Sequence, residues 1–258
     1  MSLTNKALKD TFGDLLELDN SNNGVGSTAK VLKDGKGVSS ALKIGTNGAV
    51  ISPNADADSL LVQNAAGTNL LSVDASASSV KAGVGAARYV NSQQINFASF
   101  NQDTGAGEHD MMDVDNMLIT GVGTNLGTSG DPATSLAVTS YVTVMNKFYY
   151  LPYDSIIDNV TAFVTSSADN DANVLFHLMS FDISLGNGAT TTFGDLSSGT
   201  VVADHSTTLT NVNSTHMCSI ALTVGGSTVA GGKVLVATVE NDNSDNIYAK
   251  LCVNYHYK

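Results

Sequence analysis

The chain has 258 residues, of which 42% are hydrophobic and 14% are charged, and its formal net charge is −12. This acidity excludes the nucleic-acid-binding class, because those proteins need a Lys/Arg surface to displace counterions from phosphates. The many turn-forming polar residues and the few surface-helix residues favour an all-β fold over a helical one.

Residues 1–39 are expected to form an N-terminal attachment segment. A helical pattern over Leu3–Leu18 is weakened by Gly13, so we expect a helix or turn up to Phe12 and a strand around Leu15–Leu18. Four apolar residues precede any stable core and are predicted to dock on a larger particle: Phe12, Leu15, Leu16 and Leu18. Residues 1–43 carry a net charge of +1, which leaves −13 for the rest of the chain. No signal-peptide pattern and no run of about 20 apolar residues is visible, so we expect no membrane span.

Residues 40–82 read as thin β-hairpins. One centres on Asn47–Gly48, a pair that suits a tight turn with positive φ, and a second joins strands near 60–62 and 70–73, followed by a strand near 79–81. Hairpins this thin are marginal alone, so the segment is predicted to be an oligomeric stalk, with a homotrimer favoured. The alternative is a peripheral hairpin layer on one globular domain.

Residues 83–135 are rich in glycine and are predicted to be a connector, with strands near 95–100 and 117–119 that could be outer strands of the head. Residues 136–258 show strong period-2 patterns and are predicted to be a jelly-roll-like β-sandwich head. The strand at 175–183 is apolar on both faces and should be buried on both.

The residue patterns favour no catalytic or metal site. His216 and Cys218 would lie about 6–7 Å apart along one strand face, too far for a direct bond. Asp113 and Asp115 read as a solvated acidic loop rather than a hydrolytic pair. The oxygen-rich stretches Asp169–Asp171 and Glu240–Asp245 lack the closing Glu of a calcium loop, and His177 reads as a core histidine. We therefore expect no cofactor, no metal and no enzymatic activity, although the residues leave Ca²⁺ binding by the acidic loops open.

Several stretches resemble the fibre and decoration proteins of tailed bacteriophages, especially marine ones. The resemblance is carried by residues 12–20, 33–37, 41–45 and 60–83 and, more loosely, by Tyr149-Tyr-Leu-Pro-Tyr153 before the sandwich. It implies a virion surface protein, usually trimeric and fixed by its N-terminus to other virion proteins, on either tail or capsid.

Under this reading the head loops would contact a host surface glycan or protein. The candidate residues are those of the polar turns: Asp169, Asn170, Asp171, Asn187, Asp242, Asn243 and Asp245. A capsid decoration protein without a host ligand is the alternative, and a polysaccharide depolymerase is a third reading.

Overall fold

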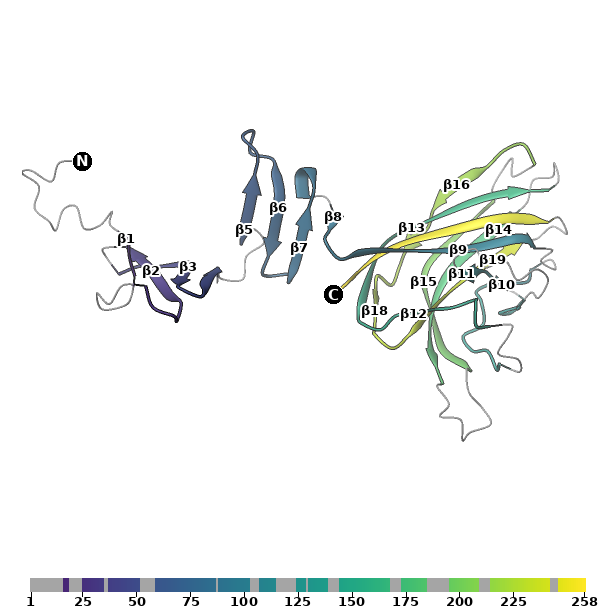
Figure 1. Ribbon diagram of the computed structural model, residues 1–258. Coiled ribbons are helices and arrows are strands. Elements are labelled where there is room, and N and C mark those ends of the chain that lie inside the picture. Colours follow the sequence, from purple (N-terminus) through teal and green to yellow (C-terminus); the bar gives the residue numbers. More distant parts are fainter. Residues whose placement is uncertain are drawn as a thin grey trace, which may run out of the picture. The chain divides into compact units, whose positions relative to one another are not determined.

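The computed structural model describes residues 16–18, 25–34, 37–51, 59–86, 88–102, 107–114, 124–128, 130–138, 144–167, 173–184, 195–208, 214–241 and 246–258 (Figure 1). The chain divides into two compact units, Met1–Val90 and Asn91–Lys258. Apart from one short 3₁₀ turn, η2 (Val84–Ala86), every regular element of the described residues is a β-strand. The all-β prediction is therefore confirmed, and the helix considered before Phe12 lies outside the described residues.

The first unit contains two antiparallel four-stranded sheets. One has the order β1 (Leu16–Leu18), β2 (Lys30–Asp34), β3 (Ser39–Gly45) and β4 (Gly48–Ile51). The hairpin expected at Asn47–Gly48 forms, but Gly48 closes the ladder opposite Gly45, so Thr46 and Asn47 are the turn residues. Neither has a positive φ, whereas Gly48 does, at 151°.

The second sheet of this unit has the order β5 (Leu60–Gln63), β6 (Asn69–Asp74), β7 (Ser79–Ala82) and β8 (Arg88–Tyr89). The β5–β6 turn is fixed by Asn64, whose Oδ1 accepts hydrogen bonds from the backbone N–H groups of Ala66 (3.0 Å) and Thr68 (2.9 Å). Gly67 takes the left-handed conformation, φ 78°, that an L side chain rarely adopts. The local turn chemistry therefore accounts for the predicted hairpin.

The second unit is built from two antiparallel sheets of six strands. The β20 sheet has the order β11 (Asp113–Val114), β9 (Ser92–Gln102), β20 (Ile247–Tyr257), β13 (Ser155–Ser166) and β16 (Cys218–Ala221), and β18 (Thr228–Val229) also pairs with β13. The β14 sheet has the order β10 (Asp110–Met111), β19 (Val234–Asn241), β14 (Asn173–Ile183), β15 (Leu196–Thr208) and β17 (Thr223–Val224), and β12 (Tyr149–Tyr150) also pairs with β19.

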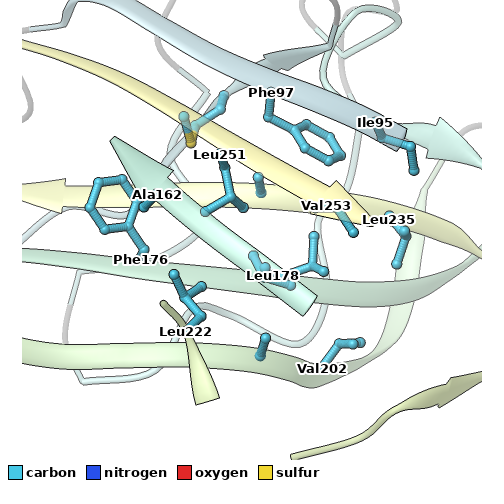
Figure 2. Packing of buried hydrophobic residues seen from close by; sticks show 14 of the residues in the cluster. Ile95, Phe97, Ala162, Phe176, Leu178, Val202, Leu222, Leu235, Leu251 and Val253 are labelled. Carbon is cyan, nitrogen blue, oxygen red and sulfur yellow. The ribbon is translucent and has the colours of Figure 1, made fainter. Parts of the chain in front are cut away.

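The two sheets enclose the main hydrophobic core. Leu251 and Val253 on β20 and Phe176 and Leu178 on β14 belong to this core, and none of these four side chains is exposed (Figure 2). Alternate residues of one strand point to opposite faces, so each strand contributes every second side chain. The arrangement is sandwich-like, as the period-2 patterns predicted.

The outer face of the β14 sheet carries a second buried cluster. Met179 and Phe181 on β14 pack there with Val234 and Val236 on β19, and residues before β12, such as Leu126, cover them. Strand β14 is therefore buried on both faces, which confirms the prediction made from its two apolar rows. Residues 136–138, where the head was predicted to begin, make only one bridge, Leu136 to Leu196, and form part of this cover.

The unit boundaries differ from those drawn on the sequence. The second unit begins at Asn91 rather than 136, because β9 pairs along β20 and buries Ile95 and Phe97 in the main core. The range 83–135 is therefore more than a connector. The division at residue 39 also differs, since it falls inside β3 and separates β2 from the strand with which it pairs.

Candidate interaction surfaces

The sequence-derived contact residues lie almost wholly outside the described part of the chain. Leu16 and Leu18 belong to β1, where their backbones pair with Asp34 and Leu32. The structure does not describe the other proposed contacts, namely Phe12, Leu15, Asp169, Asn170, Asp171, Asn187, Asp242, Asn243 and Asp245. These assignments stay predictions, but the described strand ends show where the loops leave the sandwich.

Two of the three predicted loops leave from the same end of the sandwich. Ser166 pairs with Ile247, and the backbone N–H of Ser167 donates to the carbonyl of Asn246 at 2.8 Å. Val174 pairs with Asn241 in the other sheet, so segments 168–172 and 242–245 are anchored side by side. Segment 185–194, which contains Asn187, leaves from the opposite end, between the paired residues Ile183 and Leu196.

The end that carries segments 168–172 and 242–245 lies away from the point where the chain enters the sandwich. Strand β9 starts opposite His256, and the Asn91 side-chain amide donates to the carbonyl of Tyr257 at 2.8 Å. It finishes at Gln102, which is paired with Ile247. We call the Asn91 end proximal and the Gln102 end distal.

Charge is divided between the two units. Residues 1–90 contain eight acidic and eight basic residues, whereas residues 91–258 contain sixteen acidic and four basic ones, a net charge of −12. Two of these four lysines are paired: Lys147 Nζ lies 3.1 Å from Asp113 Oδ1, and Lys233 Nζ lies 2.7 Å from Asp182 Oδ1. The hydrogen bond from Lys233 lowers the pKa of Asp182 below its ordinary value. The first unit is thus neutral, and the sandwich is strongly acidic.

The β5–β8 sheet has one wholly apolar face across three strands. Its cross-strand register forms two rows of neighbouring side chains, Leu60–Val73–Val80 and Val62–Leu71–Ala82. The other face carries polar residues such as Ser72 and Lys81. A sheet with one apolar face needs that face covered for independent stability.

The β1–β4 sheet carries a smaller apolar patch on β3 and β4, next to Lys30 on β2, which pairs with Ile44. Leu42 pairs with Ile51 and Ile44 with Ala49, which places four apolar side chains on one face. Ile51 is 48% exposed, and Val62 in the second sheet is 46% exposed. Among the described residues between 25 and 90, no side chain is buried. These two faces are therefore open apolar surfaces in the isolated chain.

A tyrosine cluster lies at the proximal end and joins Tyr149 and Tyr153 to two tyrosines of β20. The hydroxyl of Tyr255 lies 3.2 Å from that of Tyr149 and 3.4 Å from that of Tyr257, and the Tyr153 ring packs edge-on against Tyr257 with centroids 5.5 Å apart. Burial, and then the hydrogen bonds to the other two tyrosines, raise the pKa of Tyr255. The cluster joins β12 to β20, and Tyr153 is 66% exposed.

The groups considered for catalysis are engaged in other contacts. The exposed His216 bonds through Nδ1 to Thr215 Oγ1 at 2.9 Å, whereas Cys218 packs partly buried against the main core. Asp113 binds Lys147, and Asp115 lies outside the described residues. Both cysteines are free thiols. Within the described ranges, no group of three His, Cys, Asp or Glu side chains is arranged to hold a metal ion.

In the described part of the chain, no helix has the length and apolar character needed to cross a membrane. Comparison of the sequence with models of known protein families and with curated proteins finds no match.

Proposed function

We propose that this chain is a fibre-type structural protein of a tailed-phage virion, in which the first unit forms an oligomeric stalk and the second forms a projecting head. The N-terminus would dock on other virion proteins, and the head would adhere to the host surface. The proposal rests on a contrast between the units. The first unit has open apolar faces and no buried side chain among its described residues, whereas the second unit has two buried hydrophobic clusters.

The stalk assignment rests on the two apolar faces. A second and third copy of the same chain would cover the rows Leu60–Val73–Val80 and Val62–Leu71–Ala82 with matching rows. The neutral charge of residues 1–90 permits close association of copies, whereas the −12 of the sandwich disfavours it. A homotrimer also agrees with the usual state of the proteins that the sequence resembles.

The order of the strands supports a jelly-roll assignment for the head. If β9, β12, β13, β14, β15, β16, β19 and β20 are counted as strands 1 to 8, the two sheets have the orders 1-8-3-6 and 2-7-4-5. This interleaving is the jelly-roll pattern of two Greek keys, which recurs in virion proteins. The small strands β10, β11, β17 and β18 extend the sheets beyond it.

Adhesion is assigned to the distal end. Segments 168–172 and 242–245 are anchored there, and together they hold Asp169, Asp171, Asp242 and Asp245 but no lysine or arginine. Binding residues concentrate on loops held by a rigid scaffold. Here the scaffold is a two-sheet β-sandwich. We propose binding without turnover, because His216, Cys218 and Asp113 are held apart in contacts of their own.

Two experiments test the proposal. Gold-labelled antibodies against residues 91–258 should decorate intact particles in electron microscopy, and a complete lack of label on purified particles would refute a virion role. Purified full-length protein should then compete with phage for adsorption to host cells. If particles are labelled and adsorption is unaffected, the protein is a decoration protein without a host ligand; release of soluble sugar from host polysaccharide would point to a depolymerase.

A further inference from the structure

A strap of chain crosses the outer face of the β14 sheet. We define the strap as the described residues 107–114, 124–128 and 130–138. At one edge the Met112 backbone N–H donates to the Ala237 carbonyl on β19 (2.8 Å). At the other edge Leu136 and Leu196 exchange two backbone hydrogen bonds of 2.9 Å. Because β14 lies between β19 and β15, the strap passes over β14.

The strap is held by its ends and by its own hydrogen bonds. The N–H of His109 donates to the Gly127 carbonyl (2.9 Å), and that of Leu126 donates back to the His109 carbonyl (2.7 Å). The N–H of Gly199 on β15 donates to Thr134 (2.8 Å), and a Cβ at Gly199 would collide with the Phe181 ring and the Thr134 backbone. The strap therefore lies directly on the sheet and buries Met179 and Val236 beneath it.

A buried polar cluster lies where the strap crosses β14. His109 on the strap is unexposed, His177 on β14 is 3% exposed, and their rings pack edge to face with centroids 5.1 Å apart. Nε2 of His109 donates to the carbonyl of Gly130 (2.9 Å), which leaves its Nδ1 with a free lone pair. Nδ1 of His109, Nδ1 of His177, Oγ1 of Thr238 and Oε2 of Glu240 are buried without any hydrogen-bond partner.

The groups around His177 come from all the elements packed against it. Thr238 on β19 and Asp204 on β15 are its cross-strand neighbours, and Glu240 is the next residue on the same face of β19. From the strap come His109 and Asp131, whose Oδ1 is 3.7 Å from His177 Nε2 and therefore not hydrogen-bonded to it. Burial, and then the neighbouring His109, lower the pKa of His177 from 6.5 to about 4, against the opposing effect of Asp131 and Asp204.

We propose that the strap is an acid-released latch, closed over the β14 sheet while His177 is neutral and opened when this buried imidazole is protonated. A proton added to His177 would place a charge on a buried ring whose Nδ1 has no hydrogen-bond acceptor, next to the packed His109 ring. Opening the strap restores water to the imidazoles and exposes the apolar face that holds Met179 and Val236. The latch does not depend on the proposed virion function.

The direction and size of the effect follow from proton linkage. The open state binds a proton on His177 near pH 6.5 and the closed state only near pH 4, so acidification favours the open state. With these two values, the opening constant should rise about 30-fold between pH 7.5 and pH 5. The rise should level off below about pH 4, where both states carry the proton.

Hydrogen–deuterium exchange of the full-length protein, with labelling times scaled for the intrinsic exchange rate, measures this constant. We expect peptides from 107–114 and 130–138 to lose protection by about 30-fold at pH 5, while β13 and β20 peptides do not change. His177→Met, which keeps the volume without a titrating group, should abolish the pH response, and His216→Gln should preserve it. On acidification from pH 7.5 to pH 5, the fluorescence of a dye that binds apolar surfaces should rise in the wild-type protein and stay unchanged in His177→Met.

Either of two results overturns the latch. One is a strap whose protection is equal at pH 7.5 and pH 5 in the wild-type protein, and the other is a pH response that survives in His177→Met. If His177→Met does not fold, an NMR titration of the wild-type histidines decides the matter. His177 titrating near 6.5 while the strap signals stay unchanged would also overturn the latch.

Discussion

Strand β9 is the first strand of the sandwich, and its removal gives the sharpest test of where the folded unit begins. We expect the fragment 91–258 to fold alone and the fragment 136–258 to fail, because only the longer one contains β9. This strand pairs with β20 from Ser92 to Gln102 and places Ile95 and Phe97 in the main core, at 2% and 0% exposure (Figure 2). Its loss would also leave a full edge of β20 without hydrogen-bond partners.

The cost can be estimated side chain by side chain. Truncating a buried Phe to Ala costs about 3–5 kcal/mol, and truncating a buried Ile costs about 2–5 kcal/mol. Together these losses approach the whole stability of an ordinary domain, about 5–15 kcal/mol. The point variant Phe97→Ala in the fragment 91–258 should therefore remain folded but lower the melting temperature by roughly 6–20 °C.

Circular dichroism and limited proteolysis measure both effects. The fragment 91–258 should give a strand-type spectrum, a cooperative transition and a protease-resistant band, whereas 136–258 should be degraded. Met217→Ala is the matched control, since this side chain is 72% exposed and its loss should cost less than about 0.5 kcal/mol. If the fragment 136–258 melts cooperatively at the same temperature as 91–258, then β9 does not stabilise the sandwich and the reasoning is refuted.

The other predictions concern the core, the stalk, the ion pair and the attachment segment. Phe176→Ala should destabilise the head by about 3–5 kcal/mol in denaturant unfolding, because this ring is fully buried between the sheets, and a loss below 1 kcal/mol would contradict the packing. Val73→Asp should shift the oligomer toward monomer in light scattering, since it places a charge on the apolar stalk face, and an unchanged mass would count against that interface. Lys147→Met should cost about 3 kcal/mol in the same unfolding assay, because it leaves Asp113 and the Met111 carbonyl without their shared donor; a wild-type midpoint would show that the pair is not stabilising. Deleting residues 1–24 should abolish incorporation into particles while the oligomer and head stay folded, and normal incorporation would move the anchor elsewhere.

The strands with the clearest alternation were predictable from the sequence. Strands β14 and β20 are long and carry an uninterrupted apolar row, so their burial could be read directly. Strand β9 also has an inward apolar pair, Ile95 and Phe97, but the row continues with Ser99, the outward Gln94 and Asn96 are polar, and glycines flank the strand. Only pairing with β20, about 150 residues later, makes it an interior strand. Local pattern carries no information on such a partner.

The strap and the contact between His109 and His177 could not be predicted from the sequence, for a related reason. The predicted head begins at residue 136, yet residues 136–138 serve as a cover because the outer face of the β14 sheet is apolar and needs one. His177 was predicted to be a core histidine and is buried. Its neighbour His109 comes from a loop-like stretch 68 residues earlier, and no spacing rule joins the two. The loop contacts were predicted from composition alone, and composition does not say which end of a sandwich a loop occupies.

The position of β20 has a consequence for how the protein is made. It pairs with both β9 and β13 but follows them in the chain, so the β20 sheet stays in two parts until β20 has been synthesised. The head then closes through contacts of very large sequence separation, which form slowly. Under the proposed function, the stalk segments are synthesised before β20 and bring nascent or newly released chains together first. Under the same proposal, a polypeptide that stops before β20 would join such an assembly with its β20 sheet still in two parts, so it would differ structurally from a copy that contains β20.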